Sequence, residues 1–385
     1  MSNHLQYPTR LATRKGQVVG RRDFLRQISA ASVAAGSLNV TDMLSVSAEQ
    51  LRARGMSCIL LWMQGGPSQF ETFSPKPDHK NGGETKSIST SVPGIHIAEN
   101  FPYCAKVMDD LAIIRSMTSK EGNHQRATYL LHHGYLPMAG VKFPTLGANI
   151  AHQIGDAAHD LPSHVRIGGR LPNSGGGGFL GIEYDPLVLG SAHTPRLLSA
   201  SMEAFDIQKE PGSQRAAYGG GDFAAGCRMA RRLVEHGVTF VEVTSRGWDT
   251  HQDVFSRTQE RSRQVDQPMA ALITDLKRRG MLEKTLVVWM GEFGRTPRVN
   301  PRGGRDHYPQ AFNAVVAGGG TQGGQVIGAT NDAGTEVARR PVSVQDLFRT
   351  IYHTLEIDAE HEKISRISRP IKLVDGGEVV EELFG

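Results

Sequence analysis

Short runs of consecutive apolar or β-branched residues recur along this chain and restrict its fold more than any other feature. Continuous runs, in contrast to strict alternation, are typical of strands that are buried on both faces. Such runs occupy residues 58–64, 111–117, 165–168, 239–244, 285–290 and 312–317. Amphipathic helical patterns occupy residues 222–236, 256–279 and 343–355. The sequence therefore predicts an α/β fold with a mostly parallel central sheet and helices on both faces.

The charge balance excludes one class of partner. The 385 residues hold 43 lysines and arginines against 39 aspartates and glutamates, so the formal net charge is +4. Residues 1–48 alone contain six of the basic side chains and two of the acidic ones, which leaves the rest of the chain neutral. A neutral domain has no net field that attracts nucleic acid or an anionic membrane. We therefore expect no nucleic acid partner.

The first 48 residues resemble an export signal. Residues 20–26 read Gly-Arg-Arg-Asp-Phe-Leu-Arg, a mildly apolar stretch follows over 27–40, and Val46-Ser47-Ala48 is a small-residue cleavage pattern. This order is typical of a twin-arginine signal peptide, although adjacent arginines also occur on ordinary surface helices. The apolar stretch is too short to span a bilayer. We expect a signal peptide over 1–48, one α/β domain over 49–385, a periplasmic or extracellular location and no permanent membrane anchor.

Polar, glycine-containing loops follow three of the predicted strands. They occupy residues 64–76, 245–253 and 291–297, and a similar segment follows over 303–309. The carboxyl ends of parallel strands meet at one edge of a sheet, which is where ligands bind in this architecture. We therefore expect five side chains to come within reach of one divalent metal ion, namely Asp249, His251, Glu292, Asp306 and His307. Carboxylate oxygen together with imidazole nitrogen suits zinc, manganese or iron better than calcium.

These residues also have structural interpretations when each is taken alone. Asp249 is a favoured residue type for capping a following helix, and His251 fits a solvated loop. Asp306 fits a role in orienting His307 without any metal. The convergence of several ligand-type residues after strands favours a functional site over these separate explanations. The glycine clusters lack the spacing that cradles phosphate groups, so nucleotide binding is disfavoured.

The segment around Glu292 supports two further expectations. Gly291 and Gly294 flank Glu292 at a strand end, which predicts a tight turn that only small residues tolerate. A larger residue at 294 should impair folding or the site if the backbone there needs a positive φ. Glu292 and Arg295 also fit a structural ion pair. The segment therefore has a structural interpretation beside the metal-binding one.

Four segments together resemble one family. They are the Arg-Arg-x-Phe-Leu core, residues 60–69 (Leu-Leu-Trp-Met-Gln-Gly-Gly-Pro-Ser-Gln), residues 248–251 (Trp-Asp-Thr-His) and residues 291–297 (Gly-Glu-Phe-Gly-Arg-Thr-Pro). This combination resembles the exported bacterial family called domain of unknown function 1501, over nearly the whole chain. That family is similar in fold to alkaline phosphatases and sulfatases, so the resemblance implies the fold of that superfamily of metal-dependent hydrolases.

The superfamily's metal and nucleophile positions carry over only in part. The metal-binding aspartate after the first strand corresponds to Gln64, a poor metal ligand, and the nucleophile position corresponds to Gly122. The Asp-His pair after a late strand corresponds to Glu292 and Phe293, which keeps a carboxylate and loses an imidazole. Half of a two-metal site is therefore degraded, which should abolish the standard two-metal mechanism.

Other positions of the superfamily pattern are retained. The resemblance implies that His307 corresponds to a downstream metal histidine and that Asp249 and His251 correspond to an upstream Asp/His pair. The arginine of the nucleophile segment corresponds to Arg126. A single ion held by the retained half can still generate a nucleophile from water.

We expect an exported, metal-dependent, hydrolase-like protein that acts on a phosphate or sulfate ester. Arg126 or Arg295 would bind the anionic ester. The catalytic candidates in the nearby loop are Thr118, Ser119 and His124. Thr118 and Ser119 also fit turn or cap positions.

Two alternatives explain the same sequence without catalysis. A non-catalytic envelope or glycan-binding protein would keep the sulfatase-like fold and hold an anionic glycan in the cleft. Gln64 and Gly122 favour this alternative, since each lacks the chemistry of the position it occupies. A structural envelope protein has only the export signal in its favour.

Replacing Arg21 and Arg22 together with lysine tests the export signal. The receptor reads guanidinium groups, which an ammonium group does not mimic, so we expect the precursor to accumulate in the cytoplasm. Cell fractionation followed by immunoblotting measures the distribution. The matched control replaces Arg10 and Arg14 with lysine, which leaves the motif intact and should preserve export. Unchanged export of the R21K/R22K variant contradicts the prediction.

Overall fold

The computed structural model describes residues 10–12, 18–20, 55–156, 159–190 and 202–385. The chain divides into two units, Met1–Ala53 and Arg54–Gly385. In the first unit, β1 (Arg10–Ala12) pairs antiparallel with β2 (Val18–Gly20). The paired arginines at 21 and 22 lie outside the described residues, so the signal peptide over 1–48 and the domain boundary at 49 stay predictions.

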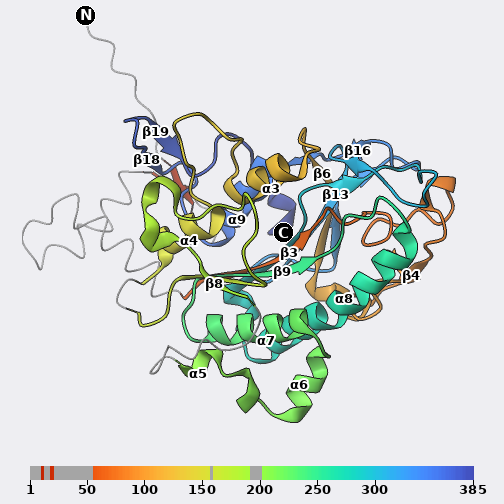
Figure 1. Cartoon of the computed structure of the whole chain (residues 1–385), viewed down its shortest axis with the longest axis horizontal. Coiled ribbons are helices and arrows are strands. Elements are labelled where there is room, and N and C mark those ends of the chain that lie inside the picture. Colours follow the sequence, from red (N-terminus) through yellow and green to blue (C-terminus); the bar gives the residue numbers. More distant parts are fainter. Residues whose placement is uncertain (1–9, 13–17, 21–54, 157–158, 191–201) are drawn as a thin grey trace, which may run out of the picture. The chain divides into compact units, whose positions relative to one another are not determined.

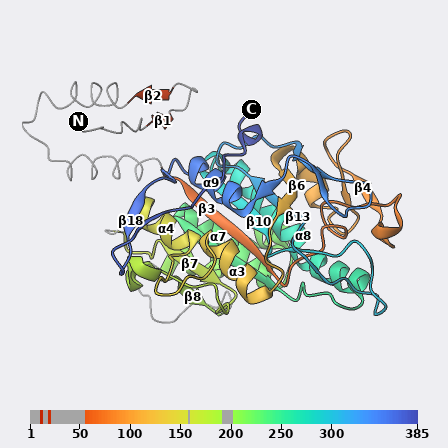
Figure 2. The ribbon, with the colours of Figure 1, turned by 90° about the horizontal axis from the view of Figure 1, so that it is seen from above.

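A central sheet organises the second unit. Within the described residues it has nine strands, in the order β14-β6-β13-β10-β3-β9-β7-β8, with β17 also paired to β6. β3 crosses the middle of the unit (Figure 2) and pairs in parallel with both β9 and β10. The strands are β3 (Ser57–Gln64), β6 (Ala112–Thr118), β7 (His164–Ile167), β8 (Leu187–Leu189), β9 (Phe240–Arg246), β10 (Thr285–Met290), β13 (Phe312–Ala317), β14 (Gln325–Ile327) and β17 (Val342–Ser343). The predicted α/β fold with a mostly parallel sheet is confirmed.

β13 runs against its two neighbours. It pairs antiparallel with both β10 and β6, whereas the other pairings of the described sheet are parallel. A parallel neighbour would need a crossover connection, usually a helix. The chain between β10 and β13 instead contains the short strands β11 (Gly294–Arg295) and β12 (His307–Tyr308), which pair with each other. The whole connection, with Glu292 and His307, therefore stays at the carboxyl edge of β10.

Helices cover both faces of the sheet (Figure 1). α7 (Asp222–Glu235) and α8 (Val254–Arg278) lie on one face, and α3 (His124–His133), α4 (Leu146–Ile154) and α9 (Val344–Thr354) lie on the other. Two consecutive residues of β3 reach both layers. Leu61 packs in the core that includes residues of α7 and α8, whereas the ring of Trp62 lies 4.3 Å from the ring of His132 in α3. Burial on both faces explains why the apolar run of β3 does not alternate with polar residues.

The three predicted helices are confirmed. α7 and α8 match the patterns over 222–236 and 256–279, and α9 begins after the N-cap Ser343, which forms a capping box with Asp346. α3 and α4 are additional helices, with Asn123 and Thr145 as N-caps. Among the described residues, no helix is long and apolar enough to cross a membrane.

Smaller elements surround the sheet. α5 (Met202–Phe205) contacts α7, and α6 (Gly212–Tyr218) contacts α8. Further two-stranded pairs form between β4 (Ser87–Ser89) and β5 (His96–Ala98), between β15 (Ala329–Thr330) and β16 (Val337–Arg339), and between β18 (Glu362–Ile364) and β19 (Pro370–Lys372).

A buried ion pair joins two neighbouring strands of the sheet. Glu242 in β9 is 1% exposed, and its carboxylate accepts a hydrogen bond from Nε of Arg166 in β7 at 3.0 Å. Burial disfavours the charged carboxylate. Arg166 and then His132 outweigh this effect and lower the pKa of Glu242 to about 2.

We expect this pair to make folding stability depend on pH in the acid range. Because the folded pKa lies below the ordinary value of 4.5, the stabilisation is present above about pH 4.5 and is lost as the pH falls toward 2. The free energy of unfolding should drop by roughly 3 kcal/mol across this window. Urea unfolding at several pH values measures the slope, which Glu242→Gln should flatten. The exposed control Glu283→Gln should keep the wild-type slope, and equal slopes for all three proteins would disprove the assignment.

Candidate metal centre

Three neighbouring parallel strands end beside one another at the carboxyl edge of the sheet. Gln64, the last residue of β3, lies opposite Arg246 in β9, and Met290 at the end of β10 lies opposite Trp62. The loops that follow these strands therefore leave the sheet at the same edge, where the predicted ligands are found.

The carboxylate of Glu292 connects three of these segments. It is 1% exposed and accepts hydrogen bonds from the backbone N–H of Gly65 at 3.0 and 3.1 Å and of Gly66 at 3.1 Å. It also lies 2.7 Å from Nδ1 of His124, the first residue of α3. The loop after β3, the loop after β10 and the start of α3 are thereby fixed to one buried anion.

The glycine at 65 lets the loop after β3 approach the loop after β9. A Cβ atom on Gly65 would lie 2.4 Å from the backbone nitrogen of Asp249, and its φ of +119° is one that L side chains rarely adopt. A larger residue would push the two loops apart, so glycine is required for the loop that carries Asp249 to pack against the loop after β3.

Three histidines, His124, His251 and His307, form a group that we call the histidine cluster. Each of them uses Nδ1 to contact an acceptor. His124 contacts Glu292, His251 lies 2.8 Å from Oδ1 of Asp306, and His307 lies 2.7 Å from the carbonyl oxygen of Gly122. Carbonyl and ionised carboxylate oxygens only accept hydrogen bonds, so each Nδ1 carries the proton. In its neutral form, an imidazole held in this way presents an unprotonated Nε2, and fixing a metal-binding histidine in this way is common in metal sites.

The Nε2 atoms converge on Asp249. Oδ2 of Asp249 lies 3.4 Å from Nε2 of His124, and Oδ1 lies 3.2 Å from Nε2 of His251 and 3.6 Å from Nε2 of His307. The Nε2 atoms of His251 and His307 are 2.9 Å apart. Two nitrogen lone pairs at this distance repel each other unless a proton or a cation lies between them. The arrangement therefore fits a bound cation.

Arg295 holds Asp249 from the protein side. Its side chain is 0% exposed and donates to Oδ1 of Asp249 at 2.6 Å, to the carbonyl of Gly66 at 2.8 Å and to that of Arg305 at 3.1 Å, with a further bond to the carbonyl of Gly65. The guanidinium thus makes four hydrogen bonds inside the protein. This placement favours a positioning role and leaves it no surface for a substrate.

The same contacts shift the pKa values of the cluster. Burial alone would raise the pKa of Asp249, but the neighbouring His124, His307 and Arg295 outweigh it and hold that pKa well below its usual range. Burial lowers the pKa of His124, but the carboxylates of Asp249 and Glu292 outweigh burial and raise it to about 9. These contacts favour a positive charge beside Asp249.

The ligand atoms of His124, Asp249 and His307 all lie within 4.8 Å of one another, which makes them a possible metal site. His251 adjoins this group through both Asp249 and His307. Of the five predicted ligands, the structure thus brings Asp249, His251 and His307 together directly. Asp306 and Glu292 reach the cluster through the histidines that they orient.

The remaining predicted site residues contact other groups. The guanidinium of Arg126 is exposed and pairs with Glu121 at 2.9 Å. The hydroxyl of Thr118 donates to the carbonyl of Val342 at 3.4 Å, and that of Ser119 accepts from the backbone N–H of Glu121 at 3.1 Å. Within the described residues, neither hydroxyl hydrogen-bonds to a side chain that could act as its base.

Two residues have roles that the sequence did not indicate. The amide oxygen of Gln64 accepts a hydrogen bond from Arg246 at 2.8 Å, so this side chain fixes the strand ends. Gly122 contributes its backbone carbonyl to His307.

His124, predicted as a catalytic helper, lies among the potential ligands. A signal for its placement is Asn123, a favoured N-cap that starts α3 at this histidine.

Neither Gly291 nor Gly294 has a positive φ, so the condition considered for Gly294 does not hold. The requirement is steric. A Cβ on Gly294 would lie 2.3 Å from the carbonyl oxygen of Ala311, and one on Gly291 would lie 2.4 Å from Cδ of Pro67. Close packing of the loop around Glu292 explains both glycines.

The chain matches the family model described as "Protein of unknown function (DUF1501)" over residues 56–200 and 192–384. The chain belongs to this family. It is the family that the motifs of the sequence resemble, so the expected membership is confirmed. No curated protein matches this DUF1501 member.

Several solved structures are similar to this DUF1501 member in part. The sulfatase PsFucS1 from Pseudoalteromonas sp. is 14% identical, with a TM-score of 0.41 and coverage of 84% of this chain and 73% of that one. A protein in the alkaline phosphatase superfamily from Vibrio parahaemolyticus is 12% identical, with a TM-score of 0.46 and coverage of 84% and 77%. The phosphonate monoester hydrolase of Agrobacterium radiobacter is 11% identical, with a TM-score of 0.43 and coverage of 86% and 77%.

Replacing Glu292 with glutamine tests its role in joining the loops. The new NH₂ group would face backbone N–H donors of the loop after β3, so at least one buried donor would lose its acceptor. We expect the free energy of unfolding to fall by about 1–3 kcal/mol, measured by urea unfolding. The control Glu362→Gln removes the same charge from an exposed position and should have no effect. Wild-type stability of Glu292→Gln contradicts the assigned role.

Proposed function

We propose that this DUF1501 member binds one divalent metal ion at the cluster of His124, Asp249, His251 and His307. The observation that carries the proposal is the common orientation of the three imidazoles, each with Nδ1 on an acceptor and Nε2 toward Asp249. Three imidazole nitrogens and one carboxylate oxygen form a donor set that suits zinc. Buried Arg295 would keep Asp249 ionised and oriented toward the ion.

We further propose that the centre hydrolyses a phosphate or sulfate ester. A divalent ion at this place would supply Lewis acidity toward the oxygens of such an ester. The substrate class rests on the resemblance of the family to alkaline phosphatases and sulfatases. Arg126 lies two residues after His124 on α3, and its exposed guanidinium is available to an anionic ester in exchange for Glu121.

The attacking group in this proposal is water. Gly122 offers no side-chain nucleophile, and the hydroxyls of Thr118 and Ser119 contact backbone atoms. The carboxylate of Asp306 is partly exposed and hydrogen-bonded to His251, so it is a group of the chain that can exchange protons with solvent beside the centre. We propose an exported location for this reaction on the basis of the twin-arginine motif.

A non-catalytic binding protein is the second candidate. It is favoured by the same two residues that depart from the hydrolase pattern, Gln64 and Gly122. Gln64 is engaged by Arg246, and Gly122 uses its carbonyl to orient His307, so both positions serve the framework. In this alternative the centre would hold an anionic glycan without cleaving it.

Removing one histidine at a time tests the metal centre. His307→Ala and His251→Ala should each lower the bound metal per chain and remove the stabilisation that a metal gives, because both histidines supply an Nε2. Elemental analysis gives the metal content, and thermal melts with and without chelator give the stabilisation. Chelation should lower the melting temperature of the wild type and have little further effect on either variant.

The matched control is His353→Ala, an exposed histidine on α9 that is not part of the cluster. It should retain wild-type metal content and the full response to chelator. Wild-type protein that holds no stoichiometric metal after supplementation, and melts identically with chelator, contradicts the centre. Hydrolysis of aryl phosphates or aryl sulfates by the metal-loaded protein then separates the hydrolase from the binding protein.

A further inference from the structure

One pocket of the structure shares no residue with the histidine cluster and has a different chemistry. Its volume is about 460 Å³, and it is lined by the loop after β3, by β6 and β14, and by the β15–β16 pair. None of the residues of the metal centre lines it. It is named here the basic pocket, after three of its lining residues, Lys76, Arg115 and Arg339.

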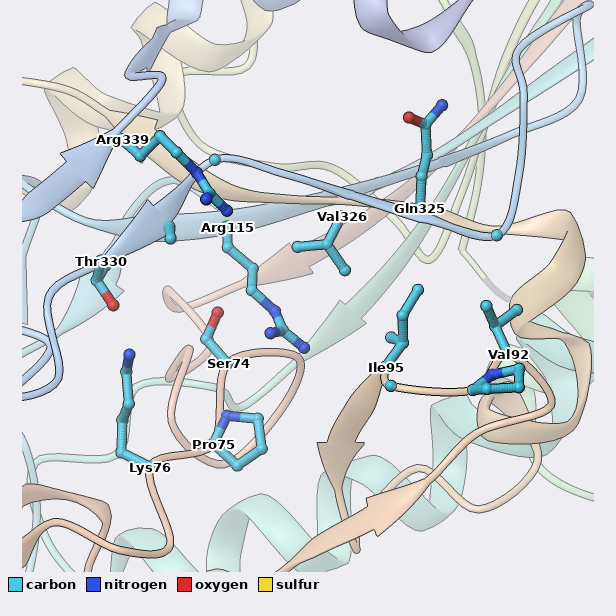
Figure 3. A pocket seen from close by; sticks show the side chains of 15 residues that line it. Ser74, Pro75, Lys76, Val92, Ile95, Arg115, Gln325, Val326, Thr330 and Arg339 are labelled. Atoms are coloured by element: carbon cyan, nitrogen blue, oxygen red, sulfur yellow. The ribbon is translucent and has the colours of Figure 1, made fainter. Parts of the chain in front are cut away.

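The three cations of the basic pocket lie on one side of it (Figure 3). No aspartate or glutamate is among the described residues that line the pocket, and none of the three cations forms an ion pair within the described part of the chain. By contrast, the neighbouring Arg340 pairs with Glu382 at 2.6 Å. Three cations that lack an ion-pair partner among the described residues, placed around one cavity, attract an anion.

Two backbone carbonyl groups hold the guanidinium of Arg115 in place. Its Nε donates to the carbonyl of Phe73 at 2.7 Å and its Nη2 to the carbonyl of His96 at 2.5 Å. These two bonds use two of the five N–H groups of a guanidinium. Nη1 makes no hydrogen bond to the described residues and remains available to a ligand.

The pKa values of two cations in the pocket, Arg115 and Lys76, are lowered. Burial lowers the pKa of Arg115 to about 10. Burial also lowers the pKa of Lys76, the charge of Arg115 lowers it further, and Asp332 opposes the shift only in part. Holding both groups charged side by side is therefore unfavourable, and a bound anion would relieve this cost.

The opposite side of the pocket is apolar. Val92 and Ile95 lie across from the cations (Figure 3), and Pro93 and Val326 also line the cavity. A bare inorganic anion would leave this side unfilled. The lining therefore matches a ligand with an anionic end and an uncharged body.

We propose that the basic pocket binds a small organic molecule that carries an oxyanion. The oxyanion contacts Lys76, Arg115 and Arg339, and the body of the molecule packs against Val92 and Ile95. This site is separate from the proposed metal centre and does not depend on a metal ion.

Isothermal titration calorimetry of the full chain with three probes tests this proposal. The probes are inorganic sulfate, inorganic phosphate and phenylphosphonate, whose carbon–phosphorus bond is not an ester. We expect phenylphosphonate to bind more tightly than phosphate because its ring fills the apolar side. The double variant Lys76→Gln/Arg339→Gln should weaken phenylphosphonate binding at least about tenfold.

The matched control removes the same two charges elsewhere, as Lys284→Gln/Arg366→Gln, and should bind like the wild type. His307→Ala separates the two sites, since binding at the basic pocket should survive it. Unchanged binding by Lys76→Gln/Arg339→Gln, together with loss in His307→Ala, would assign the anion to the metal centre and overturn the proposal. Absence of phenylphosphonate binding to the wild type would also overturn it, while metal content would still report separately on the metal centre.

Discussion

The buried carboxylate of Glu292 is the interaction on which the rest of the site depends. A buried anion is costly unless hydrogen bonds compensate it. Here the backbone N–H groups of Gly65 and Gly66 and the imidazole of His124 supply them. Because these donors come from separate segments, satisfying one charge fixes the loop after β3, the loop after β10 and the start of α3 in one arrangement.

The geometry of the candidate metal centre follows from this constraint and from similar ones nearby. Buried Arg295 ties Asp249 to the carbonyls of the loop after β3. Asp306 and the carbonyl of Gly122 orient the other two histidines. Each group that faces the centre is thus held by a group behind it, so the binding of a cation, as proposed, would need little reorganisation.

More of the fold than of the candidate site could be predicted from the sequence. Long apolar runs gave the main strands because burial on both faces removes alternation, whereas β8, β14 and β17 have only two or three residues each and carry no periodic signal. Loops after strands located Asp249, His251 and His307. The inward turn of His124 depends on a hydrogen bond to Glu292, 168 residues away. The pairing of Arg126 with Glu121 and the full burial of Arg295 are likewise set by packing, which no spacing reveals.

We propose that three imidazoles and one carboxylate share a single divalent ion. X-ray absorption spectroscopy of the zinc-supplemented, desalted protein measures the neighbours of that ion. We expect about one zinc per chain, surrounded by nitrogen and oxygen neighbours at about 2.0–2.1 Å, with the outer-shell scattering of several imidazoles and no sulfur. A zinc environment of water oxygens without imidazole scattering, or one that contains sulfur, would rule out the shared site.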